Sequence, residues 1–230
     1  MNILRADRDQ LFEYGPFTIR RQRPGEAFGP LNIIDQMTLQ LDANIPLHTQ
    51  QDNEIFSYVW RGSLLHTREN GDHVSLNSRR VMAVSAGTGV RYAQSAPFIA
   101  SEMLQATIQP AQPGGEPRVN SFTRAEESAP NSWTLLAGPT DSDAPLPLRQ
   151  AVYIYDLKLE RGAQVEVPQR AGYSSWLTVL DGIVRIGAER LRKGDSVSDA
   201  SPLPAISGER DATLLVFLVE EGAPEPSSNT

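Results

Sequence analysis

The chain has 230 residues, of which 40% are hydrophobic and 21% charged, a composition typical of a globular protein with a buried core. It contains no cysteine, which excludes disulfides, thiolate catalysis and cysteine-ligated metal sites. The formal net charge is −7, and residues 116–230 hold 11 Lys and Arg against 17 Asp and Glu, so direct nucleic-acid binding is not expected.

Short apolar segments rich in Val, Ile, Tyr and Trp are separated about every ten residues by Gly, Pro, Asn or Asp, which predicts many strands. In chain order the clearest expected strands are residues 55–60, 81–84, 151–157, 176–180 and 213–218. We therefore predict an all-β barrel or sandwich. No apolar stretch is long enough to cross a bilayer and the first residues do not resemble a signal peptide, so we expect a cytoplasmic protein without membrane contact.

The domain organisation is predicted from composition and from a short internal similarity. Residues 109–150 are dense in Pro and Gly, which favours a connection between two domains. Residues 58–65 resemble residues 178–185, since in both an apolar strand leads to a charged residue and a glycine. The resulting assignment is an N-terminal domain at 1–115, a Pro- and Gly-rich connection at 116–150, a C-terminal domain at 151–221 and a flexible tail at 222–230.

Four polar residues of the first half form two pairs with the spacing of a strand face. His48 and Gln50 are two residues apart, as are Tyr92 and Gln94, so each pair points to one side of its strand. If both faces turn inward, four polar side chains meet inside the first barrel.

Two motifs near these residues resemble the pirin family of the cupin superfamily. Residues 53–62, Asn-Glu-Ile-Phe-Ser-Tyr-Val-Trp-Arg-Gly, are similar to that family's strand around Glu-x-x-(Ser/Thr)-Tyr-(Val/Leu)-x-x-Gly. Residues 85–91, Ser-Ala-Gly-Thr-Gly-Val-Arg, are similar to its Ser/Thr-Ala-Gly-x-Gly-Ile segment. The resemblance covers most of the chain and implies two cupin (jelly-roll) β-barrels in tandem, the first holding a metal and the second usually none.

The chain departs from the family at the metal site itself. Pirins have His-x-His where this chain has His48-Thr49-Gln50, and His-x-Glu where it has Tyr92-Ala93-Gln94. Carboxamides bind first-row ions weakly, and a phenol with a pKa near ~10 must lose its proton to coordinate well. We expect no cofactor, and a barrel interior that either holds a small molecule or satisfies its own polar groups. The alternative is an Fe, Ni, Cu or Zn ion held by His48, Gln50, Tyr92 and Gln94.

Other residues near this region have two interpretations each. Glu54 is a candidate pocket carboxylate and general base, or a strand-end carboxylate that accepts backbone hydrogen bonds. Arg91 either faces an acidic ligand in the pocket or pairs with Glu54 or Glu102. His66 and His73 flank the Asn70-Gly71-Asp72 turn, so a surface position near the hairpin tip is expected for both.

Three functions are compatible with this pattern, and no residue is assigned as catalytic. The favoured one is a pirin-like bicupin that binds a small polar or aromatic molecule without a metal. The resemblance also implies a metal-dependent dioxygenase of the quercetin 2,3-dioxygenase type as an enzymatic alternative. A third function is a regulatory protein that binds an enzyme or a transcription factor.

Overall fold

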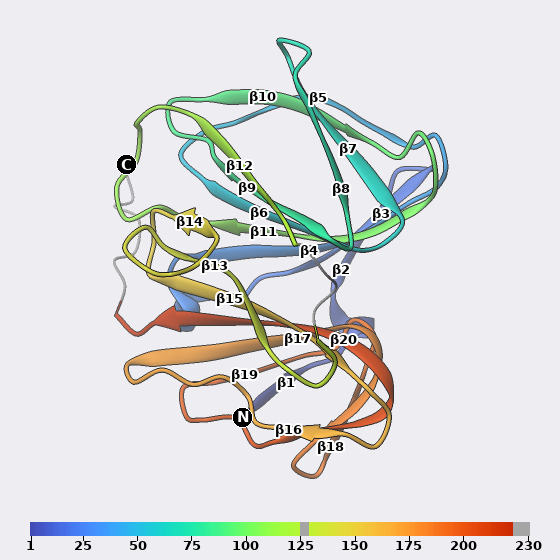
Figure 1. The fold of residues 1–230 in the computed structure, drawn as a ribbon, viewed down its shortest axis with the longest axis vertical. Coiled ribbons are helices and arrows are strands. Elements are labelled where there is room, and N and C mark those ends of the chain that lie inside the picture. Colours follow the sequence, from blue (N-terminus) through green and yellow to red (C-terminus); the bar gives the residue numbers. More distant parts are fainter. Residues whose placement is uncertain (125–128, 223–230) are drawn as a thin grey trace.

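The computed structural model describes residues 1–124 and 129–222. The described residues form strands and irregular segments with two 3₁₀ turns, at Ala6–Arg8 and Glu26–Phe28. Two curled sheets are stacked, one in the upper half of Figure 1 and one in the lower half. This architecture confirms the predicted all-β fold of two tandem cupin barrels. None of the described residues forms a helix long and apolar enough to cross a membrane.

The upper sheet forms the N-terminal barrel and has eleven strands. They are β2 (Gln10–Glu13), β3 (Phe17–Gln22), β4 (Leu31–Leu39), β5 (Asn44–Gln50), β6 (Glu54–Arg61), β7 (Ser63–Arg68), β8 (His73–Asn77), β9 (Arg80–Ser85), β10 (Val90–Ser95), β11 (Ser101–Ile108) and β12 (Arg118–Thr123). The lower sheet forms the C-terminal barrel and has nine strands. They are β1 (Asn2–Leu4), β13 (Thr134–Pro139), β14 (Leu146–Leu148), β15 (Val152–Leu159), β16 (Gln164–Val165), β17 (Tyr173–Ile186), β18 (Glu189–Arg192), β19 (Ser196–Asp199) and β20 (Ile206–Glu220).

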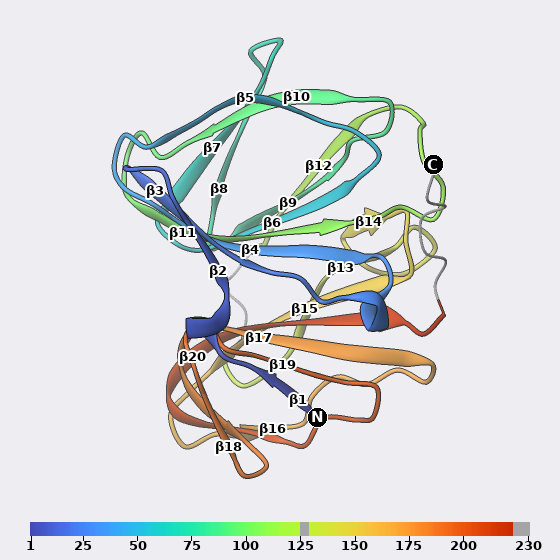
Figure 2. The ribbon, with the colours of Figure 1, turned by 180° about the vertical axis from the view of Figure 1, so that it is seen from behind.

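The chain divides between the barrels differently from the sequence-based boundaries. β1 pairs with β19, so the first residues belong to the C-terminal barrel, as the view from behind in Figure 2 shows. The expected connection at 116–150 contains three strands: β12 pairs with β9 of the N-terminal barrel, and β13 and β14 extend the C-terminal sheet. Of the expected tail, residues 223–230 lie outside the described residues.

Strand β6 shows why the apolar runs are continuous. Phe56, Tyr58 and Trp60 pack in the core between the two barrels, whereas Ile55 and Val59 pack in the interior of the N-terminal barrel. A wall with an apolar core on each side needs apolar residues on both faces of its strands. The second barrel has an interior core of its own, which includes Leu177 and Val179 of β17.

The repeated glycines of the two halves occupy equivalent turns. Gly62 has a φ of +78° and Gly182 a φ of +86°, a region that glycine adopts without strain. A Cβ atom at Gly62 would lie 1.8 Å from the Ala100 carbonyl oxygen, and one at Gly182 would lie 2.1 Å from that of Asp211. Both positions therefore require glycine.

Candidate functional site

The four positions singled out in the first half lie on β5 and β10, which pair as antiparallel neighbours. Tyr92 stands opposite His48, and their ring centroids are 4.5 Å apart with an interplanar angle of 66°. Tyr92 belongs to the interior core of the N-terminal barrel, and Gln94, two residues further along β10, is only 1% exposed. The structure thus brings His48, Tyr92 and Gln94 into one region of the barrel.

A second histidine lies in this region, which the sequence analysis did not predict. β7 pairs with the other edge of β10, and His66 stands opposite Gln94. Its ring centroid is 4.3 Å from that of Tyr92, and the side chain is fully buried. The expected surface position of His66 is therefore wrong, because Leu64 and His66 form the buried face of β7. His73 is exposed, as expected.

Several polar atoms around Tyr92 lack hydrogen-bond partners among the described residues. They are both ring nitrogens of His66 and the amide nitrogen of Gln94. The Tyr92 hydroxyl accepts a long hydrogen bond of 3.4 Å from Gln105 Nε2. Buried polar groups are almost always paired with protein or with ordered water, so these three nitrogens are exceptions among the described side chains.

Two ionisable side chains of this region, His66 and Tyr92, are uncharged at pH 7. Burial, together with the smaller electrostatic effects of Arg68 and His48, lowers the pKa of His66 to about 4. Burial also raises the pKa of Tyr92 to about 12, against the smaller opposite effect of the hydrogen bond from Gln105. The interior thus offers an uncharged imidazole, an uncharged phenol and a carboxamide.

The two residues of β5 have partners close to their own strand. His48 Nδ1 lies 3.0 Å from the Pro46 carbonyl oxygen, which fits a tautomer in which Nδ1 donates and Nε2 is free. Gln50 is partly exposed, and its side-chain oxygen accepts a 3.4 Å hydrogen bond from Asn53 Nδ2. Gln50 therefore has a local partner, whereas the amide nitrogen of Gln94 has none among the described residues.

The structure does not bring Glu54 or Arg91 to this group. Glu54 is fully buried, accepts a 2.8 Å hydrogen bond from the Ser85 hydroxyl and pairs with Arg149 Nε at 3.1 Å. Arg91 is exposed and pairs with Glu69 instead of with Glu54 or Glu102. Alternation along β10 explains the placement of Arg91, because its neighbour Tyr92 takes the inward position.

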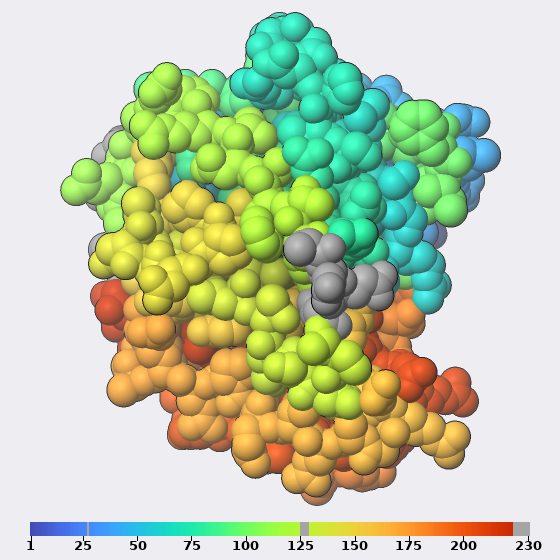
Figure 3. All heavy atoms as spheres, viewed as in Figure 1, coloured from blue at the N-terminus to red at the C-terminus, as the bar shows by residue number. Residues whose placement is uncertain are grey.

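An open cavity of about 500 Å³ reaches this region from outside. It lies beside the β7–β8 hairpin, whose tip projects at the top of the molecule in Figures 1 and 3. Its lining residues are His66, Arg68, Gly71, Asp72, His73, Val74 and Val119. His66 therefore lies beside Tyr92 and also belongs to the wall of this cavity.

Two stacked cupin barrels define the molecule as a bicupin. The sequence pattern of the family described as Pirin matches residues 5–108, and that of the quercetinase C-terminal cupin domain matches residues 135–219. The chain belongs to the pirin family.

Individual relatives agree with this assignment. A quercetin 2,3-dioxygenase of Escherichia coli K12 is 24% identical over 194 residues, which cover 83% of this chain and 82% of the relative. A pirin-like protein of Caulobacter vibrioides is 26% identical over 194 residues, 82% of this chain and 83% of the relative. Among solved structures, the Escherichia coli pirin YhhW in complex with nickel(II) has a TM-score of 0.84 at 21% identity, covering 96% of this chain and 99% of that one. At this identity the structural likeness shows the fold.

The donor set of this chain does not fit the first-row transition metal that the fold family implies. Such ions are held by several imidazoles and a carboxylate. This group has two imidazoles, His48 and His66, but its other members are amides at positions 50 and 94 and a phenol that stays protonated at pH 7. Within residues 1–124 and 129–222, no three His, Asp or Glu side chains are gathered as a metal site. Of the four positions, only position 48 carries a side chain, an imidazole, that binds such ions strongly while uncharged.

Proposed function

We propose that this pirin-family bicupin uses its N-terminal barrel to bind a small uncharged polar molecule without a catalytic metal. The observation that supports this most directly is the set of buried, unpartnered nitrogens of His66 and Gln94 beside Tyr92. A ligand with both hydrogen-bond donors and acceptors would pair with these nitrogens. An ion would be disfavoured there, because a buried charge without a counter-charge is costly.

In this proposal the ligand enters through the cavity that His66 lines. His66 lines this cavity, and its ring centroid lies 4.3 Å from that of Tyr92. Neutral His66 can accept a hydrogen bond at one nitrogen and donate one from the other, and Gln94 can donate from its amide. Selectivity in this barrel is then set by hydrogen bonds and ring stacking.

The test is native mass spectrometry of protein purified without chelators, combined with metal analysis. We expect the wild-type chain to carry a neutral small molecule, which His66→Leu and Gln94→Leu variants lose. The matched control is His73→Leu, which changes an exposed histidine of the same hairpin and should leave the bound mass unchanged. An equimolar Fe, Ni, Cu or Zn ion in the wild-type protein would contradict the proposal.

The second candidate is a metal-dependent quercetin 2,3-dioxygenase. Two findings favour it: relatives with this activity in their names cover most of the chain, and His66 adds a second neutral imidazole near His48. It predicts oxygen consumption with quercetin and an added metal, lost in a His48→Ala variant. On the first proposal no turnover occurs with any of the four metals, because the donor set does not hold them.

A further inference from the structure

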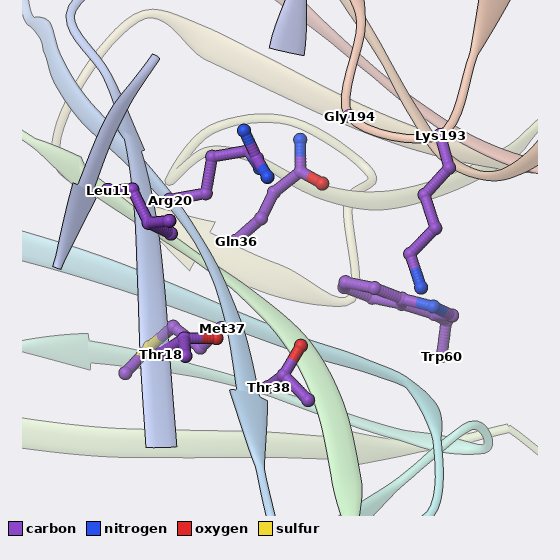
Figure 4. A pocket seen from close by; sticks show the side chains of 9 residues that line it. All are labelled: Leu11, Thr18, Arg20, Gln36, Met37, Thr38, Trp60, Lys193 and Gly194. Carbon is purple, nitrogen blue, oxygen red and sulfur yellow. The ribbon is translucent and has the colours of Figure 1, made fainter. Parts of the chain in front are cut away.

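A second cavity, of about 250 Å³, lies where the edge of the N-terminal sheet meets the C-terminal barrel. Figure 4 shows its lining: most side chains come from β2, β3, β4 and β6, and Lys193 comes from the turn between β18 and β19. The lining includes Leu11, Arg20, Gln36, Met37, Trp60 and Lys193. None of them belongs to the group around Tyr92, so this cavity is a separate site.

Arg20 and Gln36 form the polar wall of the cavity. They stand directly opposite each other on β3 and β4, and both extend into the space in Figure 4. Gln36 is only 8% exposed, and its buried amide nitrogen has no hydrogen-bond partner among the described residues. This amide is therefore an unused donor directed into the cavity.

The guanidinium of Arg20 is held in place without an ion pair. It donates to the Ala6 carbonyl oxygen, and no ion pair involves Arg20 within the described part of the chain. Asp9 is close enough for the charge of Arg20 to lower its pKa, but Gln22 is its hydrogen-bond partner. A guanidinium with remaining donors, beside an amide donor, matches the geometry of a carboxylate.

The rest of the lining is suited to an organic body. Trp60 is nearly buried, and its indole nitrogen donates to Glu102 at 2.9 Å. Lys193 also pairs with Glu102, at 2.6 Å, so this lysine has a carboxylate partner, whereas Arg20 has none among the described residues. Leu11 and Met37 add apolar surface on the side of the cavity away from the indole, as Figure 4 shows. Apolar walls with a few convergent polar groups are typical of small-molecule sites.

We propose that this inter-barrel cavity binds a small organic acid, with the carboxylate on Arg20 and Gln36 and an apolar ring directed toward Trp60. Both barrels contribute to the cavity, so an occupant also bridges them. A purely inorganic anion would use the same donors but leave the indole and the apolar residues without contacts.

The test uses benzoate as the probe, measured by isothermal titration calorimetry and by tryptophan fluorescence. We expect saturable binding, a change in fluorescence, and an affinity lower by about tenfold or more in Arg20→Gln and Gln36→Glu, because each variant removes a charge-assisted hydrogen bond or adds a like charge. Arg23→Gln is the matched control, since it removes an exposed arginine outside the cavity. Benzamide, which has no charge, should bind more weakly than benzoate.

Each alternative outcome contradicts the proposal. Absence of saturable benzoate binding, or equal binding by Arg20→Gln and wild type, would remove the site. Inorganic phosphate that binds as tightly as benzoate, with the same dependence on Arg20, would remove the organic-acid assignment. Circular dichroism and thermal melting show whether the variants fold, and Gln36→Glu provides the test if Arg20→Gln does not, since it is close to isosteric.

Discussion

Replacing the buried His66 should remove a specific part of the acid sensitivity of this protein. The pKa of the imidazole falls from an ordinary value of 6.5 to about 4 in the folded state, whereas the unfolded chain keeps the ordinary value. Below pH 6.5 the unfolded state therefore binds the proton first, and stability is lost as the pH falls until about 4, where both states are protonated. The whole shift corresponds to about 3 kcal/mol, at 1.36 kcal/mol per pKa unit.

The measurement is urea unfolding of wild type and His66→Leu at about pH 7.5 and about pH 5.5, where the same linkage gives a loss of about 1.4 kcal/mol from His66 alone. The wild-type free energy of unfolding should decrease by this amount more than that of the variant. Other titrating groups contribute equally to both proteins and cancel in the difference. The exposed His73 supplies the control, because His73→Leu should leave the pH dependence unchanged. Identical pH dependence in wild type and His66→Leu would refute the desolvated state of His66.

Three further predictions concern the stability of the two barrels. Burial raises the pKa of Asp9 to about 6, so the charged carboxylate destabilises the folded state at pH 7. Asp9→Asn should therefore stabilise the protein at pH 7 by about 1 kcal/mol, after allowance for solvent screening, but not at pH 4. Thermal melting across this pH range measures the difference. Arg149→Met should lower the free energy of unfolding by about 3 to 5 kcal/mol in urea titrations, because it leaves the fully buried Glu54 without its counter-charge. Gly62→Ala and Gly182→Ala should each lower the free energy of unfolding by more than about 2 kcal/mol, because a Cβ atom there would clash with backbone. Gly71→Ala, which has open space around it, should lower it by about 1 kcal/mol. Equal effects at the three positions would show that close backbone contacts do not matter.

Much of the fold was predicted from two local patterns: side chains that alternate between the two faces of a strand, and the residues that form turns. The placement of Tyr92 opposite His48 follows from two strands whose inward faces carry these residues. The equivalent glycines 62 and 182 could also be recognised, because a positive φ and a close carbonyl leave no alternative residue.

The missed features depend on contacts that are distant in sequence. His66 precedes a turn by a few residues, and only its pairing with Gln94 shows that β7 turns this residue inward. The strands in 116–150 were not predicted because this segment is rich in Pro and Gly, which favour loops. Pro147, for example, lies in β14 at the edge of the C-terminal sheet, where a missing N–H is tolerated. The inter-barrel cavity joins Arg20 to Lys193, and no local pattern in the sequence predicts that meeting.

Nickel binding by wild type and by the triple variant Gln50→His, Tyr92→His, Gln94→Glu tests most directly whether the barrel has lost its coordinating donors. After equilibrium dialysis against Ni(II), the variant should retain an equimolar amount of the ion, since it restores three imidazoles and a carboxylate, while wild type should retain almost none. Equimolar nickel held by the wild-type chain, and released by His48→Ala, would contradict the metal-free function proposed for the N-terminal barrel.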